Sequence, residues 1–203
     1  AHVYPKGEQF APPLLDLDTL VTLASPASAY HDGEPGLEAT AYFHTNKLTY
    51  SYGTHVTHVA VDSETGKVEV LRYAVVEDIG RCINPLLVQG QTVGAAVQGI
   101  GSTLLEELVY DDNGQLLSGT FMDYLLPTSQ DAPPIDDVTL EEAPSPLNPL
   151  GVKGAGEGGM VATGAALANA VANALAPLGV QVTELPLSPN RINAWLRHAD
   201  RGA

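Results

Sequence analysis

The sequence contains very little cysteine and few basic side chains. Cys82 is the one cysteine among 203 residues, which excludes an internal disulfide framework and favours a reducing, cytoplasmic compartment. Only 9 lysines and arginines oppose 24 acidic residues, giving a formal net charge of -15. This charge argues against binding nucleic acid through phosphate neutralisation, and against docking on a negatively charged membrane surface.

Long hydrophobic runs and a signal-like N-terminus are also lacking. The most apolar stretch follows Met160, but Thr163, Asn169 and Asn173 interrupt it, so we expect a buried helix of a globular protein and not a membrane span. The first ten residues, AHVYPKGEQF, do not have the basic-then-apolar pattern of a signal peptide. Hydrophobic residues make up 44% and charged residues 16%, which is typical of a globular domain with a real core.

The residue patterns predict an α+β fold of antiparallel hairpins packed with helices. The clearest hairpin joins residues 48–62 to 67–78 through the turn SETG, because both segments are rich in aromatic and β-branched residues. A second hairpin is expected over 109–119, where Asn113-Gly114 suits the positive φ angles of a tight turn. Further strands are expected over 37–44, 136–142 and 180–186, and helices over 14–24, 86–108, 160–177 and from Pro189 onward. We interpret the whole chain, 1–203, as one functional portion. A division into two lobes, at approximately 1–85 and 86–203, is left open.

Four glycines lie inside the helix expected over 86–108, at positions 90, 94, 99 and 101. Each costs about 1 kcal/mol relative to alanine in a helix. We therefore expect another backbone or a ligand to approach this helix too closely for side chains.

A glycine-rich loop, 148-NPLGVKGAGEGGMVATG-164, carries two competing interpretations. Gly154, Gly156 and Gly159 have the spacing of a dinucleotide-binding fingerprint, so an NAD(P)- or FAD-dependent dehydrogenase is one alternative. Against it, prolines precede the loop where a buried strand should lie, the acid nearest the required distance is Glu184, and Glu157 would repel a pyrophosphate. A lone fingerprint of this kind is a weak signal.

Glu157 lies in the middle of these glycines and just before a predicted helix. It can be a simple first-turn acid, since the N–H groups and macrodipole of a helix N-terminus favour negative charge. The glycines on both sides leave it without steric cover, so a bulky group can come close. An exposed carboxylate in a bare loop is also what a general base requires.

Four motifs in collinear order resemble a single family. They are 78-DIGRCINP-85, 89-QGQTVGAAVQGIG-101, 121-FMDYLLP-127, and 151-GVKGAGEGG-159 followed by an Ala-rich helix. Together they resemble the C-terminal part of the large, molybdenum-binding subunit of the xanthine dehydrogenase family. The likeness is greatest to the branch with aerobic carbon monoxide dehydrogenase and bacterial aldehyde and N-heterocycle dehydrogenases. It runs from about Gly36 to Leu196.

The resemblance implies a molybdenum hydroxylase that oxidises an aldehyde, N-heterocycle or similar small substrate with water as the oxygen source. Its cofactor would be molybdenum bound by molybdopterin cytosine dinucleotide, and Glu157 matches the base that deprotonates a Mo–OH group. No side chain is expected to bind the metal directly. The residues matching cofactor contacts are Arg81, Cys82, Ile83 and Asn84 in a turn, Gln91 and Gln98 on the helix after it, and Lys153, Gly154, Ala155 and Gly156 before the acid.

The chain departs from this family in length, because the usual large subunit is several times longer. The resemblance therefore implies partner chains: the remaining part of the molybdenum-binding subunit, a [2Fe-2S] subunit and usually an FAD subunit. Gly158 and Gly159 stand where relatives often have a small polar or apolar pair or prolines, which leaves the substrate class open. A noncatalytic interaction module of the same fold is a further alternative.

Two histidines, His55 and His58, lie three residues apart on a predicted strand. Side chains alternate between the two faces of a strand, so these rings are expected on opposite faces. A shared metal site is therefore not favoured.

Overall fold

The computed structural model describes residues 2–3, 15–25, 37, 40–140 and 143–202 of the chain. The chain divides into two compact units, 1–44 and 45–203. The lobe boundary considered near residue 85 falls between two elements of the second unit and stays a prediction.

The described residues of the first unit form two short strands and one helix. β1 (His2–Val3) pairs antiparallel with β2 (Leu15–Asp16). α1 (Leu17–Leu23) follows directly, and the side chain of Asp16 caps it by accepting from the amide of Thr19 at 2.7 Å. This confirms the helix predicted over 14–24, with narrower bounds.

The strand predicted over 37–44 is wrong for the residues that the structure describes there, 37 and 40–44, while 38–39 lie outside them. Tyr42 is 96% exposed and Phe43 is 61% exposed. Aromatic residues in a short segment favour a strand only when a neighbouring strand is available to pair with it.

A three-stranded sheet forms the centre of the second unit, in the order β3-β4-β5. β3 (Tyr52–Val61) and β4 (Val68–Asp78) make the predicted hairpin, with an irregularity in register between His58 and Val59. Gly66 closes the turn with a φ of 75°. β5 (Ile135–Leu140) pairs parallel with the second half of β4. The α+β class is thus confirmed, although the third strand comes from a distant segment and not from a second hairpin.

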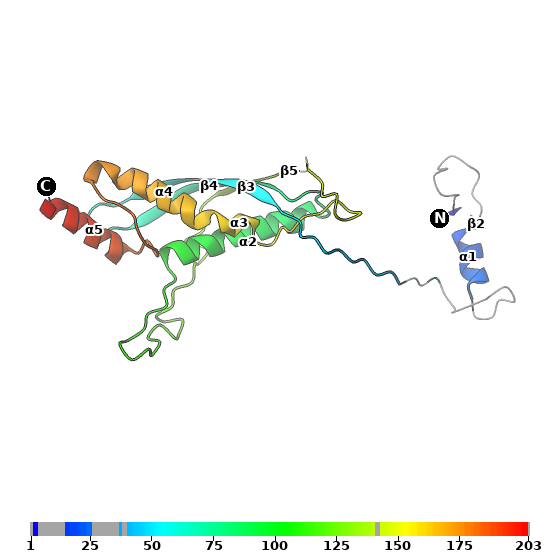
Figure 1. The fold of residues 1–203 in the computed structure, drawn as a ribbon, viewed down its shortest axis with the longest axis horizontal. Coiled ribbons are helices and arrows are strands. Elements are labelled where there is room, and N and C mark those ends of the chain that lie inside the picture. The colour runs from blue at the N-terminus through cyan, green and yellow to red at the C-terminus, as the bar shows by residue number, and fades with distance from the viewer. Residues whose placement is uncertain (1, 4–14, 26–36, 38–39, 141–142, 203) are drawn as a thin grey trace. The chain divides into compact units, whose positions relative to one another are not determined.

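Helices cover one face of this sheet, as Figure 1 shows for α2 and α4. α2 (Pro85–Leu104) is capped by Asn84, whose side chain accepts from the amide of Leu87 at 3.2 Å. α3 (Gly158–Val161) and α4 (Thr163–Leu175) are separated at Ala162, so the single helix predicted over 160–177 is interrupted. The 3-10 helix η1 (Ala176–Leu178) and α5 (Pro189–Gly202) follow, and α5 confirms the helix predicted from Pro189.

Gly158–Leu178 is long and apolar enough to cross a membrane by length and composition alone. The core helix of a soluble protein passes the same test. Leu167, Val171 and Leu175 are buried within the second unit, on the side of α4 that packs in the core.

Two groups of buried side chains make up the core. One joins the sheet to α2 and α4 through Tyr73, Val75, Ala96, Ile100 and Leu167. The other joins the end of α4 to α5 through Val171, Leu175, Val180, Leu187, Ile192 and Leu196, with Trp195 packed against it. Burial of these side chains holds the sheet and helices as one layer on another.

Two predicted β elements take other forms. Residues 109–119 turn back on themselves, but they form only the isolated bridge of Tyr110 with Leu116, and in this turn φ is positive at Gly114 alone. Residues 180–186 are not a strand, although Val180 is buried. Their apolar side chains pack into the core from an irregular backbone, because no described strand lies beside them to complete a ladder.

The helix glycines are explained in part by close packing. A Cβ placed on Gly99 would lie 2.6 Å from the Cβ of Thr163, and one on Gly101 would lie 2.7 Å from Pro127. At Gly90 and Gly94 nothing lies within 4 Å of such an atom. A close approach is therefore present at Gly99 and Gly101, although side chains make it and not the backbone or ligand that was expected. At Gly90 and Gly94 no described atom makes such an approach.

Replacing Gly99 by alanine should destabilise the protein, because the added methyl group overpacks the α2–α4 contact. Overpacking of this kind costs about 1–3 kcal/mol. The matched change, Gly94→Ala, meets no atom within 4 Å and should gain up to about 1 kcal/mol from helix propensity. Denaturant unfolding of both variants measures the difference, and equal stabilities would contradict the packing argument.

Candidate functional site

The glycine-rich loop lies against the turn that contains Arg81 and Cys82. Gly80 and Val152 form an antiparallel bridge. The amide of Arg81 donates to the carbonyl oxygen of Gly151 at 2.9 Å, and the amide of Lys153 donates to that of Ile79 at 2.8 Å. Two segments about 70 residues apart, each proposed from sequence to contact one cofactor, are thus brought side by side.

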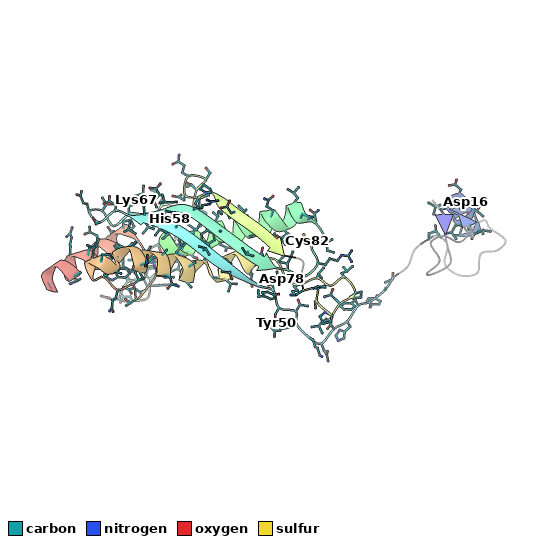
Figure 2. The ribbon with its side chains drawn as sticks, turned by 90° about the horizontal axis from the view of Figure 1, so that it is seen from above. Asp16, Tyr50, His58, Lys67, Asp78 and Cys82 are labelled. Atoms are coloured by element: carbon teal, nitrogen blue, oxygen red, sulfur yellow. The ribbon has the colours of Figure 1, made fainter. Side chains whose placement is uncertain are left out.

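A buried ion pair fastens the loop to the end of β4. The Nζ of Lys153 lies 3.0 Å from the Oδ1 of Asp78, and these side chains are 8% and 1% exposed. Asp78 also accepts from the amide of Gly80 at 2.7 Å and from the hydroxyl of Tyr52 at 3.1 Å. Figure 2 shows Asp78 at the same end of the hairpin as Tyr50, with Cys82 nearby.

Burial by itself raises the pKa of Asp78, but the hydrogen bonds from Gly80, Lys153 and Tyr52 and the charge of Lys153 outweigh it. The pKa of Asp78 is therefore held below its usual value. The ammonium of Lys153 also lies 4.7 Å from the centre of the Tyr52 ring. Since its amide donates to Ile79 and its ammonium group lies on Asp78 and Tyr52, Lys153 mainly fastens the loop to β4.

Glu157 occupies the N-cap position of α3, and its side chain is exposed and makes no capping hydrogen bond. α3 is a single turn, so any macrodipole acting on Glu157 is weaker than that of the longer helix expected from sequence. Glu157 lines a cavity of approximately 340 Å³, which we name the Glu157 cavity. Its wall is formed by Ser51, Tyr52, Gly53, His55, Glu77, Gly154, Gly156, Glu157, Gly158, Val161 and Ala162.

The glycines around Glu157 have different environments. Nothing lies within 4 Å of a Cβ placed on Gly154 or Gly156, so these two leave the backbone bare toward the cavity side. A Cβ on Gly158 would instead collide with the Oε2 of Glu77, and one on Gly159 with the carbonyl oxygen of Thr92. The first two glycines can admit a ligand, whereas the last two allow α3 to pack on β4 and α2.

Ala155 is half-buried in the glycine-rich loop, and the other sequence-predicted residues lie on the turn before α2 and on one exposed face of α2. Arg81, Ile83 and Asn84 are exposed and Cys82 is half-buried. Gln91 and Gln98 are exposed together with the open Gly90 and Gly94. Gln91 is next to Thr92, which touches Gly159, whereas Gln98 lies about 10 Å farther along the helix.

Sequence reasoning missed two side chains of the Glu157 cavity, His55 and Glu77. His55 was considered only as a metal ligand, and Glu77 follows the apolar residues 74–76 near the end of β4. Glu77 is 2% exposed, its Oε1 accepts from the hydroxyl of Thr92, and its Oε2 has no hydrogen-bond partner. An acid directly after an apolar run was the available signal, because carboxylates are rarely fully buried without a reason.

Residues 2–133 match the family model described as the molybdopterin cofactor-binding domain. This match covers more than half of the chain. The chain belongs to the molybdopterin cofactor-binding family. The resemblance drawn from the four sequence motifs is thereby confirmed at the level of the family, although Glu157 itself lies beyond the matched residues.

Individual relatives agree with this family. Over 179 residues the chain is 43% identical to the gamma subunit of the 6-hydroxypseudooxynicotine dehydrogenase complex of Paenarthrobacter nicotinovorans, covering 88% of this chain and 22% of the relative. The crystal structure of quinoline 2-oxidoreductase from Pseudomonas putida 86 has 46% identity and a TM-score of 0.69, covering 71% of this chain and 18% of that one. A Cu,Mo-CO dehydrogenase structure has 29% identity and a TM-score of 0.81, covering 91% and 23%. The chain therefore spans about a fifth of the length of the relatives it matches.

The described residues are compatible with molybdopterin on chemical grounds. A pterin and its phosphates need hydrogen-bond donors and acceptors together with close access to backbone amides. The amides of Gln91 and Gln98 lie on the exposed face that also contains Gly90 and Gly94, and the bare Gly154 and Gly156 offer unhindered backbone. Within the described part of the chain, no three His, Cys, Asp or Glu side chains gather as a metal site.

Proposed function

We propose that the chain is part of a molybdenum hydroxylase and that Glu157 is its general base. The enzyme would oxidise an aldehyde, an N-heterocycle or a similar small substrate, with water as the oxygen source. The observation that carries this proposal is the exposed, uncapped carboxylate of Glu157 in the wall of a cavity, between glycines that leave the backbone open. A base must be within reach of the proton it removes and must not be consumed by internal hydrogen bonds.

The cofactor would be molybdopterin in its cytosine dinucleotide form. It supplies the two-electron oxidation chemistry that no side chain here can supply. The chain would contribute the amides of Gln91 and Gln98, the turn from Arg81 to Asn84, and the backbone of Lys153 to Gly156. The ion pair of Lys153 with Asp78 and the bonds of the loop to Ile79 and Arg81 would keep these segments in register.

Glu157 would accept the proton from the water-derived oxygen that attacks the substrate carbon. Removing this proton makes the oxygen a better nucleophile, which is the usual contribution of a general base. The glycines on its N-terminal side would let the reacting groups come within hydrogen-bonding distance. Val161 and Ala162, which line the same cavity, would limit access of bulk water on the other side.

Among the substrate classes, an N-heterocycle is favoured. Quinoline, on which the relative with 46% identity acts, is itself an N-heterocycle, whereas the identity to the CO dehydrogenase structure is 29%. Aldehydes remain within the proposal.

The relatives are about four to five times longer than this chain, so activity should require partner chains. These would be the remaining part of the molybdenum-binding subunit, a [2Fe-2S] subunit and an FAD subunit that carries the electrons away. The assembly would work in the cytoplasm, as the single cysteine suggests.

The dinucleotide alternative has little structural support. A fingerprint of this kind needs a strand directly before the glycines and a helix after them. Val152 forms only an isolated bridge, and α3 is a single turn. A noncatalytic module of the same fold would leave the exposed Glu157 without a role.

Metal analysis and visible absorbance of the assembled protein test this function. We expect stoichiometric molybdenum together with iron–sulfur absorbance. Stoichiometric NAD binding without molybdenum would support the dinucleotide alternative, and an intact complex with neither cofactor would support the noncatalytic one.

Gly156→Val should lower the molybdenum content with the fold retained, because the valine side chain enters space that is open here. Gly164→Ala, where a Cβ makes only ordinary contacts at 3.5 Å or more, is the matched control and should retain molybdenum.

A further inference from the structure

The imidazole of His55 joins β3 to the residue after Glu157. Its Nε2 lies 2.9 Å from the carbonyl oxygen of Gly158, and its Nδ1 lies 2.7 Å from the hydroxyl of Tyr73. A carbonyl oxygen can only accept, so Nε2 must carry a hydrogen and donate it. Both ring nitrogens are thus engaged, and the ring is held edge-on to Tyr73 with an interplanar angle of 87°.

Tyr73 extends this connection to the start of α4. Its hydroxyl lies 3.0 Å from the Oγ1 of Thr163, which donates to the carbonyl oxygen of Gly159 at 3.0 Å. Tyr73 and Thr163 are both fully buried. Burial raises the pKa of Tyr73, so its hydroxyl keeps its proton at neutral pH. The hydroxyl of Tyr73 has a single hydrogen, so it donates either to Thr163 or to the Nδ1 of His55. His55, Tyr73 and Thr163 therefore form a cluster of close polar contacts whose two ends hold successive carbonyl groups, those of Gly158 and Gly159.

Glu77 restricts the same residue by contact. It lies on the face of the hairpin that also carries His55 and Tyr73, since side chains two apart on a strand share a face. Its Oε2 fills the space that a Cβ on Gly158 would need, and its Oε1 accepts from Thr92 of α2. Gly158 is thus bonded on its carbonyl side and enclosed on its Cα side.

Lys153 is fastened to β4, but the backbone between Lys153 and Glu157 lies open. Gly154 and Gly156 have open space where a side chain would be, and the carboxylate of Glu157 makes no capping bond. The direction of the Glu157 side chain therefore depends on the anchor that follows it.

We propose that His55 is a positioning residue that orients Glu157 by holding the Gly158 carbonyl group. This inference rests on the proposed function, in which Glu157 is the general base. His55 touches neither the substrate nor the cofactor in this role, and it acts only through the backbone. A histidine that merely supported the fold would stabilise the protein without affecting the geometry of the loop.

The test compares His55→Ala, His55→Gln and the control His58→Ala in the assembled protein. His58 is on the same strand and is exposed, so it matches the residue type without the contact. In His55→Ala we expect faster amide hydrogen exchange across residues 154–162. We also expect kcat to fall by about 10- to 100-fold, the size expected when a reacting group is misplaced by about 1 Å. KM and molybdenum content should change little.

Glutamine at position 55 can donate to the Gly158 carbonyl through its amide. His55→Gln should therefore partly restore both the slow hydrogen exchange of residues 154–162 and the kcat. His58→Ala should match the wild type. Unchanged hydrogen exchange in His55→Ala would overturn the anchor, and faster exchange with unchanged kcat would overturn its role in orienting Glu157.

If His55→Ala fails to assemble, Tyr73→Phe provides the second measurement. It keeps the ring in the core but removes the hydroxyl that holds Nδ1, so smaller changes of the same kind are expected. Wild-type turnover in Glu157→Gln would disprove the proposed function instead, and the hydrogen-exchange result would still report on the anchor.

Discussion

Replacing Glu157 by glutamine should abolish most of the turnover of the assembled enzyme while leaving the cofactor bound. Glutamine is nearly isosteric with glutamate but cannot accept the proton. Loss of a general base costs about 10²–10⁴-fold in rate, so kcat should fall by that factor. The fold should not change, because the Glu157 side chain is exposed and makes no capping bond. Steady-state kinetics together with molybdenum analysis measure both quantities on one preparation.

A matched control separates the loss of a base from the loss of a charge. Glu69 is an exposed acid on β4, and it lines a different cavity, in the groove that also contains Lys67 and Pro134. Glu69→Gln should therefore leave kcat at the wild-type value. A Glu157→Gln enzyme with wild-type turnover would remove Glu157 as the base, whereas one without molybdenum would indicate a role in cofactor binding.

The elements that sequence predicted well are those whose signals are local. The β3–β4 hairpin follows from two alternating apolar segments and a four-residue turn ending in Gly66, whose φ is positive. α2 begins where Asn84 and Pro85 place a cap and a first-turn proline. Each of these signals lies within a few residues of the structure that it determines.

The features that sequence predicted wrongly or not at all depend on contacts with residues far away in the chain. Residues 180–186 have the composition of a strand but meet the core through single side chains, Val180 among them. β5 was expected as a strand, but its parallel pairing with β4 joins residues about 60 positions apart. A single sequence contains no record of such pairings.

Some residues of the candidate site were recognisable from the sequence, and others were recognisable only from contacts in the structure. Glu157 and its glycines were recognisable from the loop and from its resemblance to a family. The contributions of His55 and Glu77 depend on contacts with Gly158, 103 residues after His55 in the chain. The sequence alone does not explain why residue 158 is a glycine. In the structure the buried Glu77 carboxylate occupies the space that a side chain at position 158 would need.

The buried ion pair of Asp78 and Lys153 should be the most sensitive point of the scaffold under the site. Asp78→Asn removes the charge that neutralises the buried Lys153 ammonium, and breaking such a pair costs about 3–5 kcal/mol. Denaturant unfolding of the assembled protein should show this loss. Molybdenum content should fall with it, because the same pair fastens the glycine-rich loop to β4.

The loss of unfolding free energy in Asp78→Asn should depend on pH in a definite direction. The pKa of Asp78 is lowered in the folded protein, so its stabilising contribution is complete above the unfolded pKa of about 3.9. It declines as the pH falls through the lower, folded pKa. The difference in unfolding free energy between the wild type and Asp78→Asn should therefore be largest near neutral pH and shrink below about pH 4.

The exposed ion pair of Arg72 and Asp136 supplies the control for Asp78→Asn. Its side chains are 70% and 51% exposed, and exposed pairs contribute about 0–1 kcal/mol. Asp136→Asn should consequently change stability and molybdenum content little at any pH. If the two variants lose equal stability, burial is not what makes the Asp78–Lys153 pair important, and the glycine-rich loop must be held mainly by its backbone bonds to Ile79 and Arg81.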